Sequence, residues 1–206
     1  MHAWKETGEF PDTENARSRK AYDDRLKVLE DSGLTRGKLW PPSGQHERAV
    51  GLCTVTGELD EFWAPTSDGR DVWKLAKDDR WVVGTCDYDC GVLERWWVDD
   101  LKTGREVSAD PLELAQMRFY ATWFALRYKT PVLVSLTHWP RSPASAPPKR
   151  IFAKRPWSVL DAEEFVETLE KARLAIARSR GLKVADARPG SHCSWCPTME
   201  RCPELV

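Results

Sequence analysis

The most informative stretch of this chain is Trp96-Trp97-Val98-Asp99-Asp100-Leu101-Lys102-Thr103-Gly104. Its apolar start predicts a strand, and Thr103-Gly104 indicates a turn after it. Residues two apart on a strand point to the same face, so we expect the Asp100 carboxylate beside the Lys102 ammonium. A carboxylate can hold a hard cation, and a nearby lysine can steady a water molecule or a developing negative charge. The pair therefore suits metal-dependent cleavage of a phosphodiester.

A second carboxylate comes from Gly84-Thr85-Cys86-Asp87, on the strand expected before it. A carboxylate in an apolar strand costs free energy to bury unless it is paired or binds a metal. Asp87 and Asp100 could together hold one or two Mg²⁺ ions. Asp99 competes with Asp100 as a ligand, and Asp100 is preferred because it shares a face with Lys102. A hairpin whose charges face solvent is the alternative that so short a pattern leaves open.

A helix is expected from Asp110-Pro111-Leu112-Glu113 to about Tyr128, because Asp can cap, proline suits the first turn and Glu113 can complete a capping box. Gln116 and Tyr120 are four residues apart, so they share a face of this helix. They could orient Lys102 or contact a nucleotide phosphate. An ordinary polar helix surface is the alternative.

The other expected elements indicate one α/β domain. Strands are expected over 46–55, 58–63, 81–88, 93–102, 131–139 and 150–154, with a turn at 89–91, and helices over 14–31, 110–128 and 161–180. This order favours a mixed central sheet flanked by helices. A length of 206 residues fits one such domain with a small appendage.

Composition excludes some classes of function. The net charge of -1 argues against a simple basic nucleic-acid coat protein, but acidic metal ligands would offset basic residues in a nuclease. No run of 18 apolar residues predicts a membrane span. The start, residues 1–6, has no apolar core of a signal peptide. Six cysteines without such a signal indicate thiols in a reducing cytoplasm.

The cysteines Cys193, Cys196 and Cys202 have the spacing C-x2-C-x5-C, which is typical of a metal site. Three thiolates need a fourth ligand. Zinc would accept His192 or another cysteine, whereas an iron–sulfur cluster normally takes a distant fourth cysteine. Cys53 is the best remaining candidate. Three unliganded thiols are the alternative.

These motifs together resemble the RecB-like nucleases of the PD-(D/E)XK superfamily. Gly84–Asp87 is similar to the family's G-x-x-D strand, Asp100–Gly104 to its D-x-K-T-G strand, and Gln116–Tyr120 to its Q-x-x-x-Y helix. The three final cysteines resemble those of the iron–sulfur branch, which includes AddB-type and CRISPR-associated nucleases. The motifs span residues 84–202. The resemblance implies a restriction-endonuclease-like fold, with a nuclease core over 1–188 and a cysteine knuckle over 189–206.

The resemblance also implies roles for residues. Asp87 and Asp100 would bind Mg²⁺ or Mn²⁺ with the backbone carbonyl of Leu101, and Lys102 would help to activate the attacking water. Gln116 and Tyr120 would support the site and the DNA. The cysteine triplet would hold a [4Fe–4S] cluster, with Zn²⁺ as the alternative.

The family's early G-x-x-x-H pattern is incomplete here. His2, with Glu6 four residues later, resembles its end and would be a further metal ligand, but the glycine would precede Met1. This predicts a chain that starts upstream or a truncated version. His46 is an alternative ligand that fits less well.

The expected function is a metal-dependent deoxyribonuclease, with exonuclease action favoured, in recombination, repair or phage and defence DNA processing. Its expected partners are DNA, single-stranded or with free ends, and a helicase or a recombination or defence complex, in a prokaryotic or phage-encoded setting. Lys149, Arg150, Lys154 and Arg155 could grip a strand backbone, and Trp157 could stack on a base. A solvated edge is the alternative for this cluster. The alternative hypothesis is a catalytically inactive nuclease fold that binds nucleic acid or serves as a structural subunit, stabilised by zinc or an iron–sulfur cluster.

Overall fold

The computed structural model of the protein describes residues 31, 39–62, 76–92, 94–104, 109–140 and 147–180. Apart from Asp31, the helix expected over 14–31 lies outside these residues, as does the cysteine segment 189–206. In the described part of the chain, no helix is long and apolar enough to cross a membrane.

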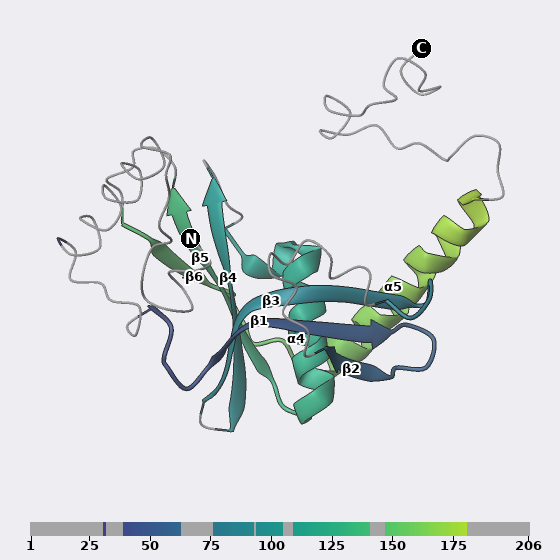
Figure 1. Cartoon of the computed structure of the whole chain (residues 1–206), viewed down its shortest axis with the longest axis horizontal. Helices are drawn as coiled ribbons and strands as arrows, with labels where there is room; N and C mark the ends of the chain where they lie inside the picture. The colour runs from purple at the N-terminus through teal and green to yellow at the C-terminus, as the bar shows by residue number, and fades with distance from the viewer. Residues whose placement is uncertain are drawn as a thin grey trace, which may run out of the picture.

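A six-stranded mixed sheet forms the centre of the fold, in the order β2-β1-β3-β4-β5-β6 (Figure 1). The strands are β1 (Gln45–Cys53), β2 (Leu59–Phe62), β3 (Trp81–Val92), β4 (Arg95–Gly104), β5 (Val132–Pro140) and β6 (Lys149–Phe152). Only the pair β4–β5 is parallel among them. A parallel pair needs a crossover connection, and the helix between these strands supplies it.

Two helices, α4 (Ala115–Tyr128) and α5 (Val159–Arg180), lie in the described part of the chain. Helix α4 packs between the sheet and α5 and buries side chains around most of its circumference, including Met117, Trp123 and Phe124 (Figure 1). These side chains join Val98 of β4 and the alternate residues Val132, Val134 and Leu136 of β5 in one apolar cluster, defined here as the α4-side core. Both helices therefore cover the same face of the sheet, on which the residues of β4 and β5 with even numbers lie.

The opposite face carries a smaller cluster of Leu39, Trp40, Tyr88, Cys90, Trp97, Leu101 and Trp139. The alternation of β4 places Trp97 and Leu101 here and Val98 on the other side. A fully buried strand must be lined on both faces, which explains why Trp96–Leu101 is apolar except for its two aspartates.

The expected mixed sheet with helices is confirmed, and β6 is the expected edge strand. The turn expected at 89–91 is wrong, because β3 continues to Val92 and pairs with β4 as far as Val92↔Arg95. Asp89 tolerates this central position because its carboxylate accepts hydrogen bonds from Arg48 Nε at 2.9 Å and from Trp96 Nε1 at 3.3 Å.

The expected helix after Asp110 starts in two steps. Asp110 does cap, because its side chain accepts a hydrogen bond from the Leu112 amide at 3.0 Å, but the turn that follows (η2, Pro111–Glu113) is a 3-10 helix. The α-helix begins only at Ala115. At α5, Ser158 and Asp161 exchange side-chain and backbone hydrogen bonds in a reciprocal cap.

Candidate active site

The site lies where the carboxyl end of β4 passes the first turns of α4. Asp100 and Lys102 follow Val98 at two-residue steps, so they lie on the α4 side of the sheet. Lys102 Nζ is 2.6 Å from Asp100 Oδ2, and the Asp100 side chain is 2% exposed whereas that of Lys102 is 32% exposed. The Lys102 ammonium therefore lies between a buried carboxylate and the solvent. A substrate would approach the site from this solvent side.

Asp87 reaches the same place from β3. The pairing of β3 with β4 ends at Tyr88↔Asp99, one pair before Asp87. Beyond that point β4 is bonded by a side chain of β3 instead of its backbone: Asp87 Oδ2 accepts a hydrogen bond from the Leu101 amide at 2.7 Å. This bond places the Asp87 carboxylate against the backbone between Asp100 and Lys102, and Asp87 is 8% exposed.

The regular alternation of β3 breaks at Asp87. Cys86 packs in the α4-side core, yet Tyr88, two residues later, packs on the opposite face. On the neighbouring strand β1, Glu47 has a φ of 55°, which is uncommon for a residue other than glycine. At this irregular point Cys86 packs in the α4-side core, and the Asp87 carboxylate bonds the Leu101 amide.

Gln116 and Tyr120 share a face of α4, as their spacing predicted, and both form hydrogen bonds in this corner. Gln116 Oε1 accepts a hydrogen bond from Lys102 Nζ at 2.8 Å, while its Nε2 donates to Tyr120 Oη at 2.9 Å and, more weakly, to Asp100 Oδ1 at 3.4 Å. Tyr120 Oη in turn donates to the Thr85 carbonyl at 2.5 Å. Burial raises the pKa of Tyr120 well above its ordinary value, so its hydroxyl stays a donor.

Gly84 leaves room for this helix. A Cβ added there would lie 3.0 Å from Tyr120 Cε1 and 3.1 Å from Phe119 Cε1. The glycine of the G-x-x-D pattern thus permits α4 to approach β3 closely enough for the Tyr120 hydroxyl to reach the strand.

Asp99 takes no part in this arrangement. It is fully buried on the opposite face, where its carboxylate accepts hydrogen bonds from Trp40 Nε1 and Thr137 Oγ1, each at 2.7 Å, and from the Ser135 hydroxyl. Arg150 Nε lies 3.7 Å from it. Burial raises the pKa of Asp99. Asp99 is therefore occupied by internal donors, and the choice of Asp100 as the metal ligand stays a prediction.

The donor set fits a hard divalent cation. Asp87 and Asp100 offer carboxylate oxygens at one corner, and magnesium is commonly held by one or two carboxylates with water completing its shell. Among the described residues there is no group of three or more histidines, cysteines or acidic residues that could hold a metal ion. His2 lies outside the described residues, and His46 lies on the opposite face against Tyr88, with ring centroids 5.0 Å apart.

The described cysteines have no such role in this corner. Burial, together with the nearby carboxylates of Asp89 and Asp87, raises the pKa of the Cys86 thiol well above its ordinary value, which keeps it protonated. Cys53 is buried at the end of β1 as a free thiol. Its proposed partners Cys193, Cys196 and Cys202 lie outside the described residues.

The predicted basic cluster is divided by the fold. Arg150 lies over the Trp97 ring, with its guanidinium carbon 4.6 Å from the ring centroid, and Arg155 forms an ion pair with Asp161. Lys149 and Lys154 make no ion pair within the described part of the chain. Trp157, expected as a stacking platform, is instead 8% exposed and its Nε1 donates to Thr122 Oγ1 at 3.1 Å.

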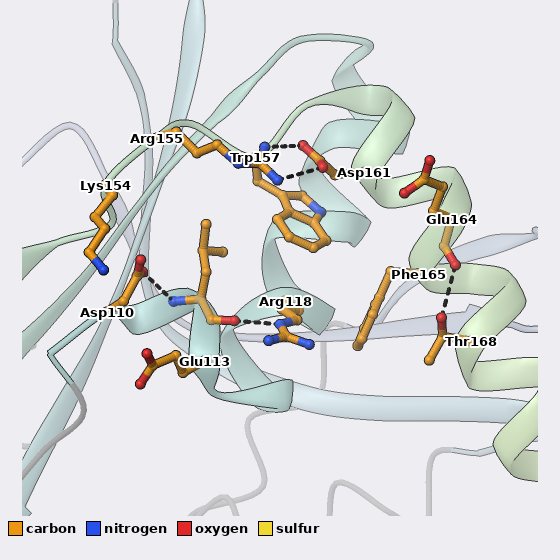
Figure 2. A pocket seen from close by; sticks show the side chains of 11 residues that line it. Asp110, Glu113, Arg118, Lys154, Arg155, Trp157, Asp161, Glu164, Phe165 and Thr168 are labelled. Carbon is orange, nitrogen blue, oxygen red and sulfur yellow. Dashed lines mark hydrogen bonds and ion pairs between the residues drawn. The ribbon is translucent and has the colours of Figure 1, made fainter.

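A cavity of about 580 Å³ lies beside the first turns of α4 and α5 (Figure 2). Its wall contains the cationic residues Arg118, Lys154 and Arg155 and the acidic residues Asp110, Glu113, Asp161 and Glu164. Two of the cationic side chains already have partners within the wall (Figure 2). Arg155 forms a salt bridge with Asp161, and Arg118 donates a hydrogen bond to the Leu112 carbonyl. The mixed charge gives the cavity no clear preference for an anion.

His138 is a residue near the site that the sequence did not suggest. It is half-buried on β5, directly beside Lys102 in the parallel register. The alternation Val132, Val134, Leu136 could have placed it on the α4 side, but the register that puts it beside Lys102 depends on a long-range pairing.

The family model described as the PD-(D/E)XK nuclease superfamily matches residues 9–203. A solved structure titled "Crystal structure of SSO0001" is similar at a TM-score of 0.39 and 12% sequence identity, covering 88% of this chain and 69% of that chain. No curated protein matches the sequence.

Proposed function

The chain belongs to the PD-(D/E)XK nuclease superfamily, whose members are generally metal-dependent nucleases, and we propose that it is itself an active deoxyribonuclease that uses Mg²⁺ or Mn²⁺. The observation that carries the proposal is the position of Lys102, which lies between the buried Asp100 carboxylate and the Gln116 side chain. A structural ion pair would not need the second carboxylate of Asp87 against the same stretch of backbone.

Each residue of the site has a separate role in phosphodiester hydrolysis. Asp87, Asp100 and the Leu101 carbonyl would hold the cation, which when bound offsets charge on the scissile phosphate and supplies an activated water. Lys102 positions that water and stabilises the negative charge that develops on the phosphate oxygens. Gln116 fixes the ammonium through its carbonyl oxygen, and its own orientation is fixed by Tyr120.

The sequence motifs support a more specific assignment. We assign the enzyme to DNA with a single-stranded segment or a free end, with exonuclease action, in recombination, repair or defence processing alongside a helicase or similar complex. Cys193, Cys196 and Cys202 would hold a [4Fe–4S] cluster, or Zn²⁺. Thiolate ligands of this kind agree with a reducing prokaryotic cytoplasm.

A nuclease assay with labelled single-stranded and double-stranded DNA tests the proposal. We expect cleavage with Mg²⁺ or Mn²⁺, none with EDTA, and a loss of at least about 100-fold in Lys102→Ala, since one charge-stabilising donor contributes about that much. Lys171→Ala is the matched control, because Lys171 is 77% exposed on α5 and, within the described residues, forms an ion pair only with Glu167. Wild-type protein that binds DNA but never cuts it with either metal contradicts the proposal and favours an inactive nuclease fold.

A further inference from the structure

Three cationic or potentially cationic residues form one row across the sheet at the site. In the strand register, Lys102 on β4 lies opposite His138 on β5, and His138 lies opposite Lys149 on the edge strand β6. Neighbouring strands lie about 4.8 Å apart, so the row extends over about 10 Å. It starts at the proposed catalytic lysine and ends at the edge of the sheet.

All three residues lie on the α4 side of the sheet. His138 follows Leu136 of the α4-side core by two residues. Ile151 pairs with Leu136, and Lys149 is two residues from Ile151, so Lys149 lies on the same side as His138. The intervening Arg150 lies on the other face, against Asp99 and Trp97.

The row is the first level of this face that is open to solvent. One level deeper, Asp100, Leu136 and Ile151 pair across the same strands, and the first two are buried. At the level of the row, the Lys102 side chain is 32% exposed, His138 is half-buried and Lys149 is exposed. Lys149 makes no ion pair within the described part of the chain, so no described carboxylate neutralises it.

We propose that His138 and Lys149 bind the phosphate backbone of the substrate strand next to the scissile phosphate. The strand would then leave the site across β5 and β6, toward the sheet edge, rather than along the cavity of mixed charge beside α5. Such contacts hold a strand in place without reading its bases. The inference rests on the proposed function, because it assigns the substrate path of that same site.

Binding and cleavage together test the row. Binding of a fluorescein-labelled oligothymidine is measured by anisotropy in EDTA at several salt concentrations, for wild type, Lys149→Ala, His138→Ala and the control Lys171→Ala. We expect Lys149→Ala to reduce the slope of log K against log salt by about 0.7, the value for one lost phosphate contact on a single strand. We expect His138→Ala to weaken binding roughly tenfold, as for a hydrogen bond to a charged group.

Cleavage kinetics with Mg²⁺ give the second measurement. Both substitutions should raise KM and leave kcat within about twofold, because uniform binding is lost and not transition-state stabilisation. Binding and KM of Lys149→Ala equal to those of Lys171→Ala would overturn the proposed phosphate contacts. Lys149 is exposed, so its variant tests the inference even where His138→Ala fails to fold. Wild type that binds without cutting removes the nuclease proposal, yet the salt slopes still decide the row.

Discussion

Replacing Asp99 by alanine tests whether this carboxylate is a structural group and not a metal ligand. The substitution removes the acceptor for Trp40 Nε1 and Thr137 Oγ1, each at 2.7 Å, and for the Ser135 hydroxyl. It also removes the negative charge 3.7 Å from Arg150 Nε, whose side chain is only 17% exposed. These groups join Trp40, β4, β5 and β6, so the loss affects one whole face of the sheet.

The magnitude follows from which donors can find other partners. The Trp40 indole cannot rotate to water at 1% exposure, and an orphaned buried donor costs about 1–3 kcal/mol. Breaking a buried ion pair costs about 3–5 kcal/mol, but Arg150 keeps its Trp97 and Leu39 contacts, so about 2 kcal/mol is reasonable here. The total of about 3–5 kcal/mol corresponds to a fall in Tm of about 10 °C for a chain of this size.

Thermal and urea unfolding followed by tryptophan fluorescence measure this change. Asp99→Asn is the matched variant, because it keeps one acceptor oxygen and should lose less stability than Asp99→Ala. An Asp99→Ala protein whose free energy of unfolding lies within about 1 kcal/mol of wild type would show that Asp99 is not a structural group. Loss of a buried, multiply bonded carboxylate should lower stability by more than an ordinary surface substitution does.

Two further predictions concern the strand β3. Gly84→Ala should displace Tyr120, which lowers stability by about 1–3 kcal/mol and slows cleavage. Urea unfolding and the nuclease assay measure these two effects. Unchanged values would show that α4 can shift to accommodate the added methyl group. Burial raises the pKa of Asp89 to about 6 from 3.8, and Arg48 offsets this only in part, so stability that is present below pH 4 is lost as the pH rises through 6. The loss is about 3 kcal/mol and should be absent in Asp89→Asn; parallel pH curves of the two unfolding free energies would contradict it.

Local sequence pattern was enough to predict the parts of the site that lie on one element. Asp100 and Lys102 share a face because they are two apart on a strand, and Gln116 and Tyr120 because they are four apart on a helix. Lys102 donates a hydrogen bond to Gln116, a contact that belongs to one of the two roles considered for this helix, and the role itself stays a prediction. Asp87 was expected on the strand beside Asp100, but the break in the alternation of β3 that accompanies its position was not predicted.

The remaining features depend on contacts between distant segments, which a single sequence does not contain. The turn was misplaced at Asp89 because the partner that makes its burial tolerable, Arg48, is 41 residues away. Trp157 was placed at the surface, whereas a bridge to Val132 draws it into the core. His138 was missed because its importance comes from the parallel register with Lys102.

We assign Asp100 to the cleavage site, whereas its neighbour Asp99 belongs to the core. The most direct test is the rate of Mg²⁺-dependent cleavage of single-stranded DNA by Asp100→Asn and Asp99→Asn, measured well below the Tm of each variant. We expect Asp100→Asn to lose cleavage without a fall in Tm, while Asp99→Asn has a lower Tm and still cuts. Cleavage that survives Asp100→Asn, or that is lost in folded Asp99→Asn alone, would contradict this assignment.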